Sequence, residues 1–261
     1  MAQLRARKRF GQNFLTDPAF ISKIIVALRV TANDHIVEVG PGYGALTELL
    51  LDSGATLDAI EIDRDLAILL QEKFAAQEKF TLHVEDALQF DLASIAAGQA
   101  LRIVGNLPYN ISTPLLFHFL QHSQYIHDMH FMLQSEVVDR IVATPDNKAY
   151  GRLSVMLQYY FTVERLFGVP ADAFRPRPKV VSAVVRLVPR TRSEEEAVDY
   201  QSLEQLLRAA FQQRRKTIKN NLRSFFSADD LQRLAIDPSQ RAENLHMAQF
   251  IRMAQALQDN L

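Results

Sequence analysis

The sequence predicts an α/β fold: a mostly parallel, seven-stranded sheet with an antiparallel edge, followed by a small all-helical C-terminal domain. Three observations support this prediction. Short runs of apolar and β-branched residues alternate with segments of helical spacing through the first two thirds of the chain. Glycine or acidic residues follow several of these runs, as is typical where strands end at a binding edge. Beyond about residue 200 only helical spacing remains.

The elements follow in order along the chain. Residues 1–16 are basic and are expected to form an arm rather than a regular element. Asp17 followed by Pro18 is typical of a helix start, and apolar residues recur at helical spacing as far as Leu28. Strands are predicted at 35–39, 57–62, 80–84, 101–104, 129–133, 155–163 and 180–188. Helical segments separate the earlier strands, which makes them parallel, whereas the last two lack a connecting helix and are expected to pair antiparallel.

A polar segment over residues 190–199 separates the strands from the C-terminal helices. The predicted organisation is therefore an arm over 1–16, a sheet domain over 17–189, a linker over 190–199 and a helical domain over 200–261. Within the last domain, Ser227 with Asp230 three residues later resembles a capping box.

Composition excludes several classes of protein. The chain has no cysteine, which rules out a disulfide framework, thiolate chemistry, iron–sulfur clusters and the common cysteine-based zinc sites. No apolar run approaches the roughly 18 residues of a membrane span. We therefore expect a cytoplasmic protein that needs neither a membrane nor a metal.

The net charge of −1 conceals a segregation of charge. The segments 5–9, 175–192 and 208–223 hold 16 of the 29 Lys and Arg residues and none of the 30 Asp and Glu residues. Basic patches on an otherwise acidic chain suggest binding to a polyanion such as nucleic acid. Chance clustering on solvated faces is the alternative that charge alone leaves open.

The strongest local motif is the glycine-rich segment 40–44, Gly-Pro-Gly-Tyr-Gly, which follows a predicted strand and opens a helix. Glycines in this context let the backbone pass close to a ligand and expose amides at a helix N-terminus. An ordinary tight turn would show the same pattern. Two acidic residues favour the binding interpretation. Glu61 ends the second strand, 21 residues after Gly40, at a position where a carboxylate can bind both ribose hydroxyls. Asp86 follows the third strand.

A tetrapeptide over residues 106–109, Asn-Leu-Pro-Tyr, follows the fourth strand. The N6 amine of adenine is a poor nucleophile because its lone pair is conjugated with the ring. The Asn106 side-chain oxygen and the Leu107 carbonyl could each accept one N6 hydrogen and thereby favour a pyramidal nitrogen. Pro108 would fix the carbonyl, and Tyr109 could stack on the base. By itself the tetrapeptide favours an ordinary turn beside a core tyrosine, and only its place beside the other motifs favours the binding interpretation.

Taken together, these motifs resemble those of the ribosomal RNA adenine N6,N6-dimethyltransferase family, most closely its bacterial small-subunit (16S) members. The resemblance rests on segments from the arm to the last strand: residues 10–15, 38–47, 61–63, 85–87, 105–109 and 174–184. It implies a Rossmann-like, class I methyltransferase fold with S-adenosylmethionine as the cofactor.

The resemblance also implies a role for individual residues. Cofactor contacts fall on Asn13, Leu15, Gly40, Glu61, Asp86 and Asn106. Glu61 would hold the ribose and Asp86 the adenine, while Glu38 would organise the loop. The catalytic set comprises Asn106, Leu107, Pro108, Tyr109 and Phe174, in which the two aromatic rings sandwich the target adenine.

Basic residues outside this set are expected to bind RNA phosphates: Arg5, Arg7, Lys8, Arg9, Arg175, Arg177, Lys179, Arg214, Arg215, Lys216, Lys219 and Arg223. The expected reaction dimethylates two adjacent adenosines in a hairpin near the 3′ end of small-subunit rRNA during ribosome biogenesis. The expected partner is the immature 30S subunit, which the chain would bind as a monomer. Two alternatives are an N6-adenine methyltransferase for large-subunit rRNA or DNA, and a non-catalytic assembly factor.

Overall fold

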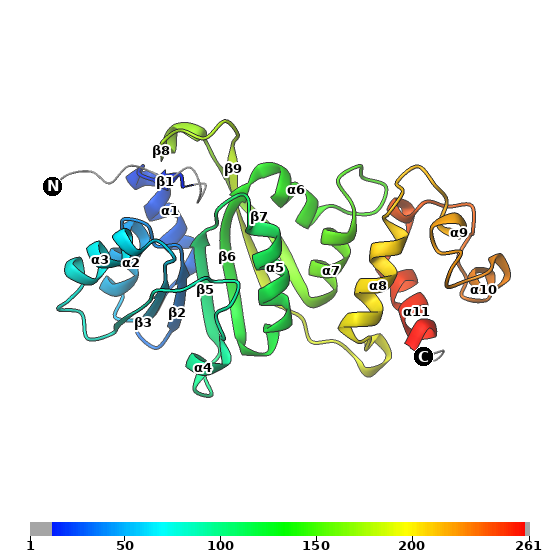
Figure 1. The fold of residues 1–261 in the computed structure, drawn as a ribbon, viewed down its shortest axis with the longest axis horizontal. Coiled ribbons are helices and arrows are strands. Elements are labelled where there is room, and N and C mark those ends of the chain that lie inside the picture. The colour runs from blue at the N-terminus through cyan, green and yellow to red at the C-terminus, as the bar shows by residue number, and fades with distance from the viewer. Residues whose placement is uncertain (1–11, 259–261) are drawn as a thin grey trace. The chain divides into compact units, whose positions relative to one another are not determined.

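The computed structural model describes residues 12–258 (Figure 1). The expected RNA contacts at Arg5, Arg7, Lys8 and Arg9 lie outside the described residues. Two compact units are present. The sheet unit extends to Val138 and includes Glu164–Pro189, and the helical unit combines Asp139–Val163 with Arg190–Leu261. This division differs from the expected one, because residues 139–163 pack with the C-terminal helices rather than with the sheet.

The sheet has seven strands, as predicted, in the order β4-β3-β2-β5-β6-β9-β7. Their bounds are β2 (His35–Val39), β3 (Thr56–Ile60), β4 (Phe80–His83), β5 (Leu101–Asn106), β6 (Ile126–Gln134), β7 (Phe161–Val169) and β9 (Ser182–Pro189). The pairings among β2 to β6 are parallel, and β9 joins β6 antiparallel from Met129↔Leu187 to Gln134↔Ser182. The α/β class and the antiparallel strand near one edge are therefore confirmed.

Helices cover both faces of this sheet. They are α1 (Pro18–Leu28), α2 (Ala45–Asp52), α3 (Arg64–Lys73), α4 (Ala93–Ala96) and α5 (Ser112–Gln121). Leucine and isoleucine side chains of α1, α2 and α3 share one buried cluster with Ile36 and Leu57 of the sheet. On the opposite face, Phe119 of α5 stacks on Phe131 of β6, with ring centroids 5.5 Å apart. The parallel strands consequently end at an edge between two helical layers.

Part of the expected arm forms a second, two-stranded sheet. β1 (Phe14–Leu15) pairs antiparallel with β8 (Phe174–Arg175), and Thr16 N donates to Ala173 O at 2.8 Å. Because strands of two residues carry no periodic signal, the sequence did not predict them. This pairing ties residues 14–16 to a segment about 160 positions away.

The helical unit contains α7 (Arg152–Tyr160), α8 (Tyr200–Ala210), α9 (Ile218–Asn221), α10 (Ala228–Arg233) and α11 (Met247–Gln258). α6 (Ser135–Val142) crosses the boundary between the units, and short 3-10 turns occupy Ser123–Tyr125, Ala171–Ala173, Glu194–Glu196 and Ala242–Asn244. α8 packs against α7 and α11 through buried leucines. The capping box is confirmed, since Ser227 Oγ accepts from Asp230 N at 3.1 Å and Ser227 N donates to Asp230 Oδ2 at 2.9 Å.

The predicted strand over residues 155–163 is wrong. Its first two thirds belong to α7, and the strand β7 begins only at Phe161. α7 is buried on most sides, so its apolar run lacks a polar face, and periodicity cannot separate such a helix from a buried strand. Ser154 supports the helix start, because its hydroxyl accepts from Gly151 N at 3.0 Å.

The predicted linker over residues 190–199 is well tied to the helical unit. Tyr159 Oη donates to Glu196 O at 2.9 Å and accepts from Val198 N at 2.9 Å. The guanidinium of Arg192 lies over the rings of Tyr159 and Tyr160, 4.8 and 4.4 Å from their centroids. Polar composition predicted a connection here, but it did not reveal these anchoring contacts. Within residues 12–258, no helix has the length and apolarity needed to cross a bilayer.

Candidate active site at the carboxyl edge of the sheet

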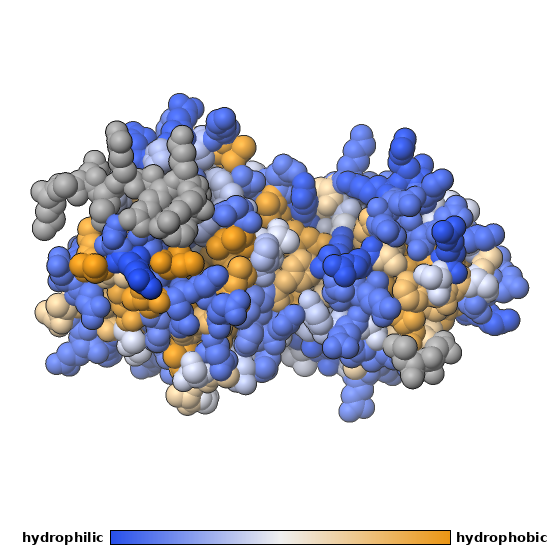
Figure 2. Space-filling model, in the orientation of Figure 1, coloured by the Kyte–Doolittle hydropathy of each residue, from blue (hydrophilic) through white to orange (hydrophobic). Residues whose placement is uncertain are grey.

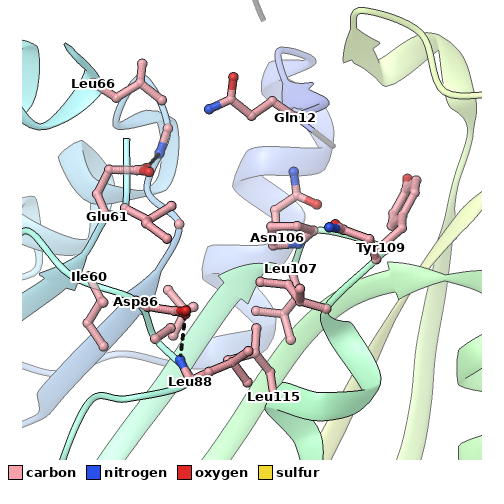
Figure 3. Close-up of a pocket in the computed structure, with 18 of the residues that line it drawn as sticks. Gln12, Ile60, Glu61, Leu66, Asp86, Leu88, Asn106, Leu107, Tyr109 and Leu115 are labelled. Atoms are coloured by element: carbon pink, nitrogen blue, oxygen red, sulfur yellow. Dashed lines mark hydrogen bonds between the residues drawn. The ribbon is translucent and has the colours of Figure 1, made fainter. Parts of the chain in front are cut away.

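A pocket lies where β2, β3, β4 and β5 end (Figure 3). Its lining brings together most of the site residues expected from the sequence: Asn13, Gly40, Glu61, Asp86, Asn106, Leu107, Pro108 and Tyr109. In Figure 3, Glu61 and Asp86 lie on the opposite side of the pocket from Asn106 and Tyr109. Parallel strands place their carboxyl ends at one edge, which explains why residues far apart in sequence meet here.

The glycine-rich loop after β2 has a backbone that other residues rarely adopt. Gly40, Gly42 and Gly44 have φ values of +69°, +61° and +77°. A Cβ atom on Gly42 would lie 2.8 Å from Cδ1 of Phe14, so the arm also requires glycine at this position. The loop can thus turn sharply while an arm residue packs directly on it.

Glu61 holds this loop to the next strand end. Its Oε2 accepts from Gly42 N at 3.3 Å, and its Oε1 accepts from Asp63 N at 2.9 Å. The side chain is buried, and this burial raises the pKa of Glu61, although hydrogen bonds from backbone N–H groups oppose the rise. Glu61 therefore organises the pocket wall as well as presenting a carboxylate to it.

Glu38 lies beneath the loop, where it does not line the pocket. It is 2% exposed, and its Oε2 accepts from Thr47 Oγ1 at 2.6 Å. Burial raises the pKa of Glu38 to about 7, with a smaller contribution from the negative charge of Glu61, while the Thr47 hydrogen bond opposes the rise. Glu38 connects β2 to α2 and supports the loop from below.

Asp86 closes its own turn after β4. Its Oδ1 accepts from Leu88 N at 3.0 Å, as Figure 3 shows. This bond fixes the carboxylate at the pocket wall beside Glu85 and Ala87. Three acidic residues line the pocket (Glu61, Glu85 and Asp86), and no Lys or Arg is among the described lining residues.

Asn106 ends β5 on the other side of the pocket. Its Nδ2 donates to Asn13 O at 2.7 Å, which fixes the orientation of the amide and leaves Oδ1 as its accepting atom. Just before Asn106, strand β5 lies so close to β2 that a Cβ on Gly105 would come within 2.6 Å of Val39 O. Leu107 N donates to Met132 O at 3.2 Å, so the backbone of the tetrapeptide is anchored to β6.

Tyr109 presents the aromatic ring nearest to Asn106 in the chain. Its hydroxyl lies 2.7 Å from Ser182 Oγ, a residue to which sequence reasoning assigned no role. Burial raises the pKa of Tyr109 above its ordinary value, although the hydrogen bond with Ser182 opposes the rise. Ser182 lies within the motif over residues 174–184, but that motif assigned no role to the serine.

The described part of the arm closes one side of the pocket. Gln12 Nε2 donates to Asp63 Oδ2 at 3.1 Å, and the Phe14 ring lies 4.5 Å from the Tyr43 ring between centroids. Phe14 lines the pocket, although the sequence did not single it out. The motif over residues 10–15 could have suggested it, since it alternates polar and aromatic side chains.

The expected pocket positions of Leu15 and Phe174 require correction. Both side chains are buried in the core cluster rather than in the pocket lining, at 7% and 0% exposure. The register of the small sheet places Leu15 opposite Phe174, and both pack with apolar residues such as Val169. In this structure Phe174 therefore does not form the second half of an aromatic sandwich.

Two of the basic residues near β8 already have contacts within the chain. Arg175 donates to the carbonyls of Asp172 and Phe174, and Arg177 forms an exposed ion pair with Asp172 at 2.9 Å. Lys179 is exposed. The arginines remain accessible, but part of their hydrogen-bonding capacity is already used.

The basic residues of the helical unit divide similarly. Arg214 donates to Lys148 O and pairs with Glu243 at 3.1 Å, which gives it a structural role. The others are exposed and form no side-chain hydrogen bond or ion pair within residues 12–258: Arg215, Lys216, Lys219 and Arg223. Figure 2 shows a largely hydrophilic surface over α9, the helix that follows Thr217.

Comparisons with known proteins agree with this geometry. A family model described as Ribosomal RNA adenine dimethylase matches residues 3–259. The Ribosomal RNA small subunit methyltransferase A of Pseudomonas aeruginosa is 53% identical over 256 residues, covering 98% of this chain and 96% of that protein. The protein of the same name from Aromatoleum aromaticum is 51% identical over 251 residues, covering 96% and 94%.

Two solved structures share the fold. A dimethyladenosine transferase from Plasmodium falciparum superposes with a TM-score of 0.79 at 24% identity, over 92% of this chain and 95% of that one. The 23S rRNA methyltransferase ErmE superposes with a TM-score of 0.71 at 23% identity, over 94% and 100%.

Proposed function

The chain belongs to the ribosomal RNA adenine dimethylase family, and on that premise we propose that it dimethylates N6 of two adjacent adenosines near the 3′ end of small-subunit rRNA. It is an S-adenosylmethionine-dependent rRNA adenine dimethyltransferase. We further propose that the two adenosines lie in a hairpin, that the immature 30S subunit is the partner, and that the chain acts as a cytoplasmic monomer. Its main support is the pocket, which joins a nucleoside-binding wall to the tetrapeptide.

The residues present fit S-adenosylmethionine. Glu61 occupies the strand end at which a carboxylate binds ribose hydroxyls, and Asp86 lies where an adenine amino group could donate to it. The acidic lining favours a cationic ligand and disfavours phosphorylated cofactors. When bound, S-adenosylmethionine supplies an electrophilic methyl group on its sulfonium sulfur.

On the opposite side, the tetrapeptide is arranged to receive an adenine. Asn106 Oδ1 would accept one N6 hydrogen and the Leu107 carbonyl the other, which favours a pyramidal nitrogen with a localised lone pair. Tyr109 would stack on the base, a contact worth about 1–3 kcal/mol. The chain contributes mainly by holding N6 in line for attack.

A methyl-transfer assay tests this function. Labelled S-adenosylmethionine is offered with immature 30S subunits, naked small-subunit rRNA, large-subunit rRNA or duplex DNA, with Asn106→Ala as the control. We expect N6,N6-dimethyladenosine in the small-subunit rRNA, detected by mass spectrometry, and at least a hundredfold slower transfer by the variant. Transfer only to DNA or to large-subunit rRNA, or none to any substrate, would overturn the proposal.

The exposed cations of the helical unit are the proposed RNA contacts in that unit. The triple variant Arg215→Glu, Lys216→Glu and Lys219→Glu should weaken rRNA binding and lower its salt dependence, while cofactor affinity stays unchanged. Arg214 is left intact because it holds Glu243. Arg233→Glu is the control for a single charge reversal outside the basic segment, at an exposed arginine that pairs with Asp230 at 3.1 Å. Equal RNA affinities for the triple variant and this control would contradict the assignment.

A further inference from the structure

Ser182 lies behind the tetrapeptide and contacts the one tetrapeptide side chain that can stack on a base. We propose that Ser182 is a positioning residue that holds the ring of Tyr109 in the orientation needed to stack on the target adenine. The inference rests on the proposed function, since it concerns how that reaction holds its substrate. Its basis is the 2.7 Å contact between the Ser182 and Tyr109 hydroxyls.

Ser182 is itself rigidly held. It is the first residue of β9, it pairs with Gln134 of β6, and it is 1% exposed. The preceding carbonyl, of Val181, accepts from Ser135 N at 3.0 Å. The Ser182 hydroxyl is therefore held in a fixed position at the end of a strand in the main sheet. A side chain on a mobile loop would not be fixed in this way.

Tyr109, in contrast, lies in the turn between β5 and α5. Its carbonyl accepts from Ser112 Oγ at 3.2 Å, which fixes the backbone, but the ring could still rotate about its two side-chain torsions. A hydrogen bond at the far end of the ring removes that freedom. This restraint lowers the entropy that would otherwise be lost when the base stacks.

The position of Phe174 increases the importance of this restraint. Because Phe174 is buried in the core, the aromatic rings among the described pocket residues are Tyr109 and Phe14. Phe14 packs against Tyr43 on the glycine-rich loop, whereas Tyr109 lies three residues after Asn106 in the same tetrapeptide. Tyr109 is thus the ring placed to align a base with Asn106, and Ser182 is the residue that fixes it.

A double-mutant cycle separates this role from a general effect on folding. Ser182→Ala and Tyr109→Phe each remove one hydroxyl of the pair, and Tyr109→Phe keeps the ring. Each single variant should lower kcat/KM for rRNA about tenfold, and the double variant should be no worse than either. Affinity for S-adenosylmethionine, measured by calorimetry, should stay within twofold of wild type.

A matched pair guards against a folding artefact. Ser182→Thr keeps the hydroxyl, while Ser182→Val has the same shape without it, so Thr should retain clearly more activity than Val. Additive losses in the cycle, or equal activity of Thr and Val, would overturn the role of Ser182. If wild type methylates rRNA and Ser182→Ala is unaffected, only this inference fails. If wild type transfers no methyl group to rRNA, the proposed function fails first.

Discussion

Replacing Gly42 with alanine should weaken S-adenosylmethionine binding about 30-fold by displacing the arm. The new Cβ would lie 2.8 Å from Cδ1 and 3.1 Å from Cε1 of Phe14, closer than carbon atoms tolerate. Because Phe14 belongs to the arm, the ring must move away from the loop. The substitution thus perturbs arm closure by moving Phe14 away from the loop, including from Tyr43.

The expected magnitude follows from the contacts that move with Phe14. The Phe14–Tyr43 ring pair contributes about 0.5–1.5 kcal/mol, and the Gln12–Asp63 hydrogen bond about 1 kcal/mol. Their combined loss is about 2 kcal/mol, or about 30-fold in Kd. Alanine at a φ of +61° also costs about 1–2 kcal/mol of folding stability, which is a separate effect.

Gly98→Ala is the matched control. Gly98 has a φ of +82°, but its added Cβ would meet nothing within 4 Å, so it carries the backbone strain alone. Titration calorimetry should show the loss of affinity only for Gly42→Ala, while thermal unfolding should show destabilisation of both variants. In a Phe14→Ala background, Gly42→Ala should cause no further loss of affinity. Equal cofactor affinities of the two glycine variants would refute the reasoning.

Three further predictions follow from buried charges. Glu61→Gln leaves one accepting oxygen for two backbone N–H groups, those of Gly42 and Asp63. The Kd for S-adenosylmethionine, measured by calorimetry, should therefore rise at least tenfold, and an unchanged Kd would contradict this. Burial raises the pKa of Glu38 from 4.5 to about 7, so between these pH values the folded chain keeps a proton that the unfolded chain loses. The unfolding free energy of the wild type should therefore fall by on the order of 3 kcal/mol as the pH rises from 4.5 to about 7. Urea denaturation should show no such fall for Glu38→Gln, and parallel pH profiles would argue against it. Asp128→Ala removes the two 2.9 Å bonds to the buried Arg102 and leaves Asp34, at 3.0 Å, as its remaining carboxylate partner. Unfolding free energy should therefore drop by about 3 kcal/mol, and a loss below about 1 kcal/mol would show that Asp34 alone compensates the Arg102 charge.

The sequence predicted the sheet and the residues that meet at the pocket well because both depend on local signals. Strands β2 to β6 show compact apolar runs, and Gly40, Glu61, Asp86 and Asn106 stand where those runs end. Since parallel strands finish at the same edge, their positions along the chain were enough to bring them together. The helix over 152–160 was missed because burial on most sides removed its polar face.

What the sequence could not predict depends on long-range register. The directions of Leu15 and Phe174 are set by the pairing of β1 with β8, and a shift of one residue would turn each side chain to the other face. A motif shows that a phenylalanine is present, but not whether its ring lies in the core or in a pocket. Similarly, Ser182 gains its meaning only from the antiparallel pairing of β9 with β6.

The arm contacts both sides of the pocket, so displacing the arm should affect both sides. Phe14 packs on the glycine-rich loop, while the carbonyl of Asn13, one residue earlier, accepts from the Asn106 amide. Moving Phe14 should therefore also release Asn106, whose oxygen faces the N6 amine in the function we propose. Gly42→Ala should accordingly lower kcat at saturating S-adenosylmethionine as well as affinity, by about tenfold if one hydrogen bond of average strength is lost. A variant with weak cofactor binding but wild-type kcat would show that Asn106 keeps its orientation without the arm.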